Sequence, residues 1–389
     1  MISFSLNNLL KTKNPEDNMN SAPIVEGHVD FLDIAKGIAI ILIVLGHTGF
    51  LGERILTFLY SFHVQTFFVV TGLLLGMTGK SRLRGDGFKK YVSKRAALLF
   101  IPYISFSLIY IIIDCITFFT HITSADLIRD AVINTLTLFG DSTLWFLPTL
   151  FIAEILFMLL AQRWDGVPLL AVSVAVALIG IIGSSVVMPH FDGFKEYVAM
   201  KILFNILVAF FRPLVCVPLL AVGYLSYTGF FKKFVTDSPK GKMDIPVKDR
   251  RILSAIGVVA IVFTFFSSGT NAKVDINLID LGNYFPTFYI NSIFGAFGVI
   301  FISARIKHFS LLSFFGKNSL TVMCTHLNCY VMYLGIQIAW MVDAFVTRAK
   351  SYVFNAVIMV VVLAVEILII PIVNKFLPFL IGKHYNRVD

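Results

Sequence analysis

Charged side chains are scarce in this 389-residue chain. Asp, Glu, Lys and Arg together make up 14% of the residues, whereas soluble domains carry about 25%. Hydrophobic residues make up 57%. These proportions exclude an ordinary soluble enzyme and predict an integral all-α membrane protein with many helices. The distribution of basic residues between the loops favours about ten membrane spans. We expect residues 31–375 to form one transmembrane domain, with cytosolic tails at 1–30 and 376–389.

Cysteine is also rare, and it follows no metal-binding pattern. All four cysteines lie in apolar runs, and none forms a C-x-x-C pair. This argues against a disulfide framework and a zinc site, and we expect no bound metal. The first thirty residues contain neither the apolar core nor the small-residue cleavage site of a signal peptide, so we expect the first helix to be uncleaved.

What the chain does contain is a series of apolar runs separated by loops of unequal charge. Loops 80–95 and 229–251 are strongly basic. Basic loops stay on the cytosolic side, so the net charge of +9 reflects membrane orientation rather than nucleic-acid binding, and both termini are predicted to be cytosolic. The sixth helix contains two prolines and is expected to be bent or broken. The predicted helices are 31–51, 55–77, 96–119, 143–161, 167–187, 201–227, 252–267, 287–303, 319–341 and 352–374.

The first two helices carry the most unusual polar residues. Lys36 and His47 are eleven positions apart, which places them on one helix face, about 16 Å apart along the axis. His63 in the second helix is expected at a depth similar to that of His47. Ionisable residues in a membrane helix usually face a wet cavity or the bundle interior. A neutral imidazole there can act as a general base near pH 7.

Each of these residues also has a purely structural interpretation. His47 can hydrogen-bond to a neighbouring helix. Lys36 can pair with Asp33 one turn earlier, or extend to the cytosolic surface. Two imidazoles at one depth, with a lysine in line on the same face, nevertheless favour a functional site.

Further polar residues are predicted inside the bundle. Glu154 lies in the fourth helix and Glu366 in the tenth, and Arg212 is expected to pair with a carboxylate. His326 and Asn328 lie near the middle of the ninth helix. There they either bridge helices or face the same cavity as the other histidines.

Two positions at the predicted membrane surfaces are candidates for ligand contacts. Arg95 lies where the third helix begins, and its guanidinium suits a phosphate group. Trp145 lies at an external interface, where it belongs to an aromatic belt or stacks on a sugar.

Five segments in order along the chain resemble the acyltransferase-3 family of membrane acyltransferases, and within it the fucose 4-O-acetylase-like branch. They are DIAKGIAIILIVLGH (33–47), SFHVQTFFVVTG (61–72), KRAALLFIPY (94–103), LWFLP (144–148) and GKNSLTVMCTH (316–326). The first two are the most specific. The resemblance implies ten helices in one domain.

The family's signature of a basic residue eleven positions before a histidine falls on Lys36 and His47, which implies that His47 is the catalytic histidine. The family also has an Arg-x-x-Arg element that contacts acyl-CoA. Arg95 matches its first arginine, but Leu98 occupies the second position. Lys90 and Lys94 are the candidates to take its place.

By resemblance, the protein transfers an acyl group, usually acetyl, from cytosolic acyl-CoA to a hydroxyl of a carbohydrate or lipid-linked glycan of the cell envelope. The expected location is a bacterial plasma membrane. His47 would deprotonate the hydroxyl, and His63, His326 or a backbone N–H would stabilise the oxyanion. Glu154 and Trp145 are further candidates for substrate contacts.

Alternatives to direct transfer stay open at this point. Thr48 and Ser61 adjoin the histidines, so a covalent acyl-enzyme is a second route. A transporter or flippase for an anionic lipid or sugar would use the same buried charges. A third interpretation is a noncatalytic membrane scaffold or sensor, in which replacing His47 changes little.

Overall fold

The computed structural model describes residues 29–120, 123–191, 193, 197–234, 245–306, 309–327, 329–345 and 351–383. Within these ranges the chain is helical and contains no β-strand. The α-helices are α1 (Asp30–Gly46), α2 (Glu53–Tyr60), α3 (Gln65–Thr78), α4 (Gly85–Phe118), α5 (Ala125–Leu136), α6 (Phe146–Ala161), α7 (Gly166–Val187), α8 (Val198–Gly229), α9 (Val247–Ser268), α10 (Phe285–Arg305), α11 (Ser310–Lys317), α12 (Ser319–Thr325), α13 (Val331–Phe345) and α14 (Ser351–Phe376).

Most of these helices are built to cross a membrane. In the described part of the chain, eight segments are long and apolar enough to do so, and α2 and α3 count together as one of them. Their outward faces carry large apolar side chains such as Ile112, Ile182 and Val259, with exposed fractions of 57%, 59% and 68%. Such surfaces need lipid around them. The protein is therefore an all-α, multi-pass membrane protein, as predicted.

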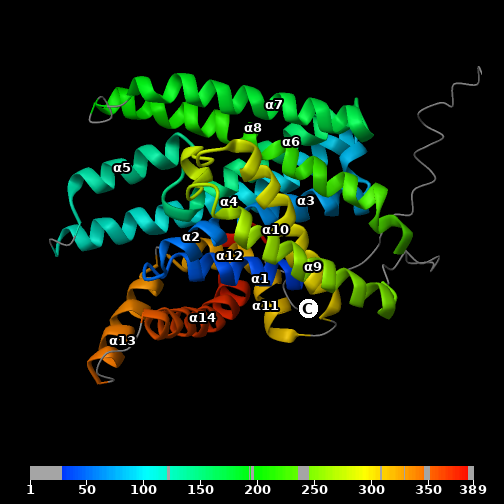
Figure 1. Ribbon diagram of the computed structural model, residues 1–389. Coiled ribbons are helices and arrows are strands. Elements are labelled where there is room, and N and C mark those ends of the chain that lie inside the picture. The colour runs from blue at the N-terminus through cyan, green and yellow to red at the C-terminus, as the bar shows by residue number, and fades with distance from the viewer. Residues whose placement is uncertain are drawn as a thin grey trace, which may run out of the picture.

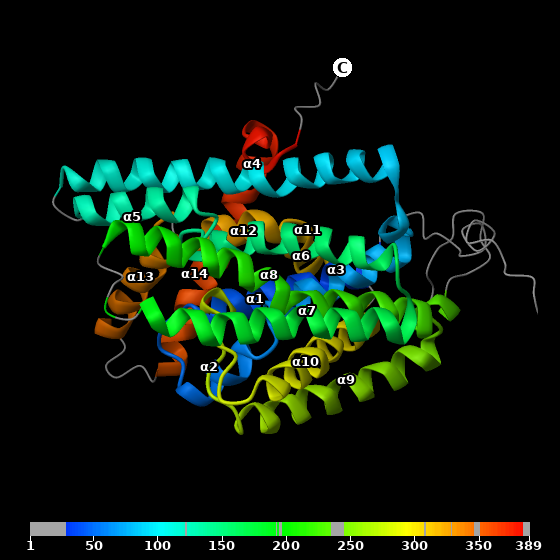
Figure 2. The ribbon, with the colours of Figure 1, turned by 90° about the horizontal axis from the view of Figure 1, so that it is seen from above.

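Helix α1 lies at the centre of the bundle, and the other helices surround it (Figure 1). It packs against α3, α10 and α11. The long helices run side by side when the molecule is seen from above, with α4 and α5 at one edge and α9 and α10 at the other (Figure 2). The pairs α3–α8, α7–α8 and α9–α10 make extensive contacts.

Glycine allows the central helices to approach closely. A Cβ atom at Gly37 of α1 would overlap the Leu312 carbonyl of α11, and one at Gly316 would overlap the Asp33 carbonyl. The same occurs between α3 and α8, where Gly72 faces a carbonyl of α8. Small residues at such crossings let two backbones touch, which is a main source of helix association within a membrane.

Three predicted helices differ from the structure because of turns that periodicity does not reveal. The first ends at Gly46 rather than Leu51, so His47 caps the helix. The second is interrupted by a turn at residues 61–64. The predicted helix 319–341 is divided into α12 and α13, and Tyr330 between them has a positive φ of 56°, a conformation that a bulky side chain rarely adopts.

Of the two forms predicted for the sixth helix, bent or broken, the break is absent, because α8 runs continuously from Val198 to Gly229 through Pro213 and Pro218. Each proline removes one backbone donor. The most apolar stretch of α8 is 78% buried, and the packing of α3, α6 and α7 along it accounts for its continuity. The eight segments, the 17-residue α1 and the divided α12–α13 correspond to the ten predicted spans. Residues 1–28 and 384–389 of the predicted tails lie outside the described residues.

Candidate active site

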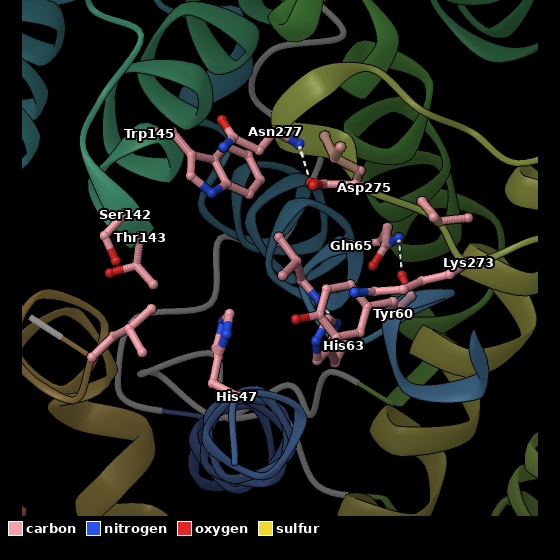
Figure 3. A pocket seen from close by; sticks show the side chains of 14 residues that line it. His47, Tyr60, His63, Gln65, Ser142, Thr143, Trp145, Lys273, Asp275 and Asn277 are labelled. Atoms are coloured by element: carbon pink, nitrogen blue, oxygen red, sulfur yellow. Dashed lines mark hydrogen bonds between the residues drawn. The ribbon is translucent and has the colours of Figure 1, made fainter. Parts of the chain in front are cut away.

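The three candidate histidines gather at one end of the bundle. His47 follows the last residue of α1, and its backbone N–H donates to the carbonyls of Ile43 and Val44. The next residue, Thr48, fixes this turn, because its hydroxyl hydrogen-bonds to the Leu45 carbonyl at 2.9 Å and to Asn355 of α14. The imidazole of His47 is left half-buried and points into a cavity (Figure 3).

This cavity, which we call the histidine cavity, has a volume of about 260 Å³. Five separate segments of the chain border it, so the fold assembles it from distant parts of the sequence. Besides His47, they are the turn between α2 and α3, the short helix η3 (Ser142–Trp145), the loop that joins α9 to α10, and the turn after α12. The lining residues are His47, Tyr60, His63, Val64, Gln65, Ser142, Thr143, Trp145, Lys273, Val274, Asp275, Ile276, Asn277 and Leu327.

His63 presents a hydrogen-bond donor beside His47. The backbone N–H of Val64 donates to His63 Nδ1 at 2.9 Å, so Nδ1 holds a lone pair. In a neutral imidazole the proton then lies on Nε2. This nitrogen is close to the end of α1, because a Cβ built on Gly46 would lie 3.4 Å from it. The ring is 2% exposed and is therefore held in this orientation.

His326 has the opposite tautomer. Its Nδ1 lies 2.6 Å from the carbonyl oxygen of Val322, and a carbonyl can only accept, so Nδ1 carries the proton. The lone pair is on Nε2, which is buried and has no hydrogen-bond partner among the residues that the structure describes. The ring centroids of His326 and His47 are 5.5 Å apart. His326 therefore presents a lone pair close to His47, whereas His63 presents a donor.

Polar atoms without partners mark the cavity as a place for a polar ligand. The Gln65 side chain donates to the Tyr60 carbonyl at 2.9 Å, but its Oε1 is buried without a partner. The Ser142 hydroxyl is also buried without a partner, and Ser142 has a positive φ of 50°. Buried polar atoms normally find hydrogen bonds. Lys273 closes another side of the cavity, with its Nζ 4.3 Å from the ring centroid of Tyr60.

Asp275 is the carboxylate of the histidine cavity. Its Oδ1 accepts the backbone N–H of Asn277 at 3.0 Å, which shapes the tip of the loop. Burial raises the pKa of Asp275, and the Asn277 N–H and the nearby Lys273 offset only part of that effect. This loop also contacts α8, because Arg212 Nη1 donates to Asn277 Oδ1 at 2.6 Å.

Arg212 is 1% exposed and fixes two segments that border the cavity. Apart from the contacts with Asn277, its guanidinium donates to Thr149 Oγ1 at 2.7 Å and to the carbonyls of Leu138 and Phe139 at 3.2 and 3.1 Å. The expected pairing with a carboxylate is wrong for the described residues, because all these acceptors are neutral. Several oriented carbonyls can replace one carboxylate around a buried guanidinium, which has five N–H donors.

The remaining candidates lie apart from the histidine cavity. Arg95 of α4 and Glu154 of α6 pair with each other, with 2.7 Å between Nε and Oε2, and Tyr91 also hydrogen-bonds to Glu154. Lys36 pairs with Asp33 at 2.8 Å, which matches its structural interpretation.

The structure also gives the locations of the other predicted site residues. Lys94 is exposed. Glu366 is buried and accepts the Thr325 hydroxyl at 2.7 Å. Trp145 lines the histidine cavity, and Asn328 lies outside the described residues.

Sequence reasoning missed most of the polar lining. Tyr60 and Gln65 lie within three residues of His63, and this proximity was a usable signal. Lys273, Asp275 and Asn277 lie in a loop more than 200 residues away, and nothing in the loop sequence places it beside α1. The structure alone brings them to His47.

The comparison with protein families agrees with this geometry. The family described as an acyltransferase domain, acyltransferase-3, matches residues 29–373. The chain therefore belongs to the acyltransferase-3 family of membrane acyltransferases. Searches of curated proteins and of solved structures gave no match.

Proposed function

We propose that the protein moves an acetyl group from cytosolic acetyl-CoA to a hydroxyl of a cell-envelope carbohydrate, with His47 as general base. The observation that carries this proposal is the arrangement of three imidazoles, two of which line one cavity while the third packs beside His47. His47 faces the cavity, His63 presents Nε2–H, and His326 presents a lone pair close to His47. Together with membership of an acyltransferase family, this set supplies a base, an oxyanion donor and an orienting acceptor.

The reaction can be written with these groups. A ring nitrogen of His47 takes the proton of the acceptor hydroxyl as its oxygen attacks the thioester carbonyl. The carbonyl oxygen becomes an oxyanion, to which His63 Nε2–H donates. The C–S bond then breaks, the ester forms, and the CoA thiolate leaves with the proton from the His47 imidazolium. The products are the O-acetylated carbohydrate and CoA-SH, and His47 returns to its neutral form.

His326 has the role of a positioning residue. Two imidazoles joined by an N–H···N hydrogen bond have centroids about 5 Å apart, so the observed 5.5 Å requires only a small adjustment. A proton of His47 directed at His326 Nε2 leaves the other ring nitrogen as the base. In a Ser-His-Asp triad, the aspartate orients the histidine in the same way, by accepting a hydrogen bond from one ring nitrogen.

Direct transfer agrees better with the hydroxyl groups than a covalent acyl-enzyme does. Thr48 uses its hydroxyl in hydrogen bonds to Leu45 and Asn355. The Ser61 hydroxyl donates to the Phe58 carbonyl at 2.7 Å. Neither residue lines the histidine cavity, so both of the nucleophiles considered from the sequence are engaged elsewhere.

We propose that the donor nucleotide binds from the cytosol, with Lys36 of α1 and Lys94 and Arg95 of α4 as its contacts. Glu154 accepts from the Nε of Arg95, which leaves the two terminal NH₂ groups for a phosphate. Leu98 replaces a second arginine, so the nucleotide would rely on lysines for its remaining phosphate contacts. The proposed location is a bacterial plasma membrane.

The test compares the wild type with His47→Ala and a control, His190→Ala, which removes an exposed histidine. Inside-out vesicles receive acetyl-CoA labelled on the acetyl group, and the label is followed into envelope glycans and protein. We expect transfer by the wild type and the control but not by His47→Ala. Equal transfer by all three would remove His47 from the mechanism. If no acyl-CoA supports transfer and the protein instead moves a solute across the membrane, the result would favour the alternative of a transporter or flippase.

A further inference from the structure

We propose that a second cavity next to the histidine cavity binds a further sugar unit of the acceptor and favours an uncharged glycan over an acidic one. This inference rests on the proposed acetyl transfer. The cavity, which we call the tyrosine cavity, has a volume of about 250 Å³. Its polar and aromatic lining consists of Tyr110, Asp114, Asp141, Tyr330 and Tyr333.

The two cavities are neighbours. Leu327 lines both of them, and Asp141 of the tyrosine cavity directly precedes Ser142 of the histidine cavity. Each volume is below the roughly 300–1,000 Å³ of a typical ligand site, whereas the two together fall within that range. A glycan with one hydroxyl at His47 would therefore place its neighbouring unit in the tyrosine cavity.

Tyr110 provides the clearest sign that a polar ligand belongs there. The residue is 4% exposed, and its hydroxyl is buried with no hydrogen-bond partner in the described part of the chain. It lies four residues before Asp114 on α4, so both side chains lie on the same face of the helix. A buried hydroxyl without a partner is unusual in a folded protein, and a sugar oxygen would satisfy it.

The charges of the tyrosine cavity indicate which sugars it accepts. Asp114 and Asp141 both line it, and neither forms a salt bridge within the described residues. Burial raises the pKa of Asp141, and Lys201, which acts in the opposite direction, is itself paired with Asp130 at 2.5 Å. Two carboxylates accept hydrogen bonds from sugar hydroxyls and repel a uronic acid or phosphate group.

Two tyrosines supply an apolar surface beside these acceptors. Tyr330 and Tyr333 are 40% and 55% exposed, and their rings meet edge to face with centroids 6.0 Å apart. Both follow the turn after α12, so they form the outer rim of the cavity. Tyrosine combines an apolar face with a polar tip, which suits the mixed surface of a sugar ring.

The first test is Tyr110→Phe, which removes only the hydroxyl. Because this hydroxyl has no partner among the described residues, we expect no loss of thermal stability. We expect KM for neutral envelope oligosaccharides to rise about tenfold, with kcat nearly unchanged. A drop in stability with an unchanged KM would show that the hydroxyl is structural, and would overturn the proposal.

The second test changes the charge of the cavity. Glycans released from the envelope of the producing cell are separated into neutral and acidic pools, and each pool is offered to proteoliposomes with acetyl-CoA inside. We expect the wild type to prefer the neutral pool, Asp114→Asn to raise KM for that pool, and Asp114→Lys to shift the preference toward the acidic pool. Asp126→Asn, which alters an exposed carboxylate on α5, is the control.

The outcomes separate the two proposals. If the wild type acetylates no pool, the proposed function fails. If the wild type acetylates glycans but prefers the acidic pool, or if Asp114→Asn and Asp114→Lys behave as Asp126→Asn does, the proposed function stands and the sugar subsite is refuted.

Discussion

Two arginines inside this membrane protein are neutralised in opposite ways. Arg95 forms an ion pair with Glu154, so its charge is balanced by a single carboxylate. Arg212 is more deeply buried and donates to neutral oxygens from residues 138, 139, 149 and 277. An ion pair joins two helices, whereas a guanidinium surrounded by carbonyls joins several loops. We propose that the donor nucleotide binds near Arg95 and that the reaction occurs in the cavity whose loops Arg212 holds.

This comparison predicts different kinetic defects at the two arginines. Substitutions of Arg212 or its partners should distort the histidine cavity and therefore lower kcat or abolish folding. Changes around Arg95 should alter KM for acetyl-CoA and leave the chemical step intact.

The largest effect is expected for Arg212→Ala. This change leaves the oxygens of Leu138, Phe139 and Asn277 without their donor, and each buried group left unsatisfied costs about 1–3 kcal/mol. We expect a loss of at least about 3 kcal/mol in the free energy of unfolding and complete loss of transfer. Thermal unfolding in detergent measures the first, and labelled acetyl transfer the second. Arg163→Ala, at an exposed arginine, is the control, and wild-type behaviour of Arg212→Ala would contradict the role.

A smaller defect is expected for His63→Ala. Removing one oxyanion donor typically lowers kcat by about 100-fold or more, so we expect that loss in kcat with KM for acetyl-CoA unchanged. His63→Gln retains an N–H donor of similar reach and should recover part of the rate. If alanine and glutamine are equally inactive, then His63 has a function other than donating to the oxyanion.

At the other arginine, Arg95→Lys should raise KM for acetyl-CoA about tenfold, since lysine cannot bind phosphate in the bidentate manner of arginine. We expect kcat to change less than KM. Steady-state kinetics at saturating acceptor provide the measurement. Glu154→Gln is the matched variant, because it removes the charge but keeps an acceptor for Tyr91. A purely structural pair would instead show lower stability in both variants and the same KM as the wild type.

The smallest effect is expected for Asp275→Asn. Burial raises the pKa of Asp275, so its ionised form is disfavoured in the folded protein, and the native state loses stability as the pH rises through this pKa. Asparagine removes this penalty and retains an oxygen for the Asn277 N–H. We expect the variant to be slightly more stable than the wild type at neutral pH, and the gap to close in acid. Thermal midpoints across that pH range test this, and a gap that widens in acid would contradict it.

The sequence predicts the helical membrane fold and the proximity of His47 and His63 well. It predicts the contacts that build the histidine cavity poorly. The lengths of the apolar runs suffice to predict a multi-pass helical protein. The placement of His47 and His63 near each other follows from the short turn between the first two helices. None of these inferences requires knowledge of long-range contacts.

The rest depends on contacts between distant segments. The tautomers of His63 and His326 are set by single hydrogen bonds to Val64 and Val322, which no pattern of residue types encodes. The sequence favoured a carboxylate partner for Arg212 because it reveals which residues are charged. It does not reveal where backbone carbonyls point in the folded chain. The break after α12 depends on the strained backbone of Tyr330, and tyrosine is not a residue that predicts such a turn.

The length of α1 has a consequence for the proposed path of the acetyl group. With 17 residues, α1 covers about 26 Å, whereas the 34 residues of α4 and the 32 of α8 cover about 51 and 48 Å. Helix α1 is therefore about half as long as either of these helices. On the proposed path, an acetyl group that follows α1 to His47 travels a distance set by the length of α1 and not by the length of the longest helices.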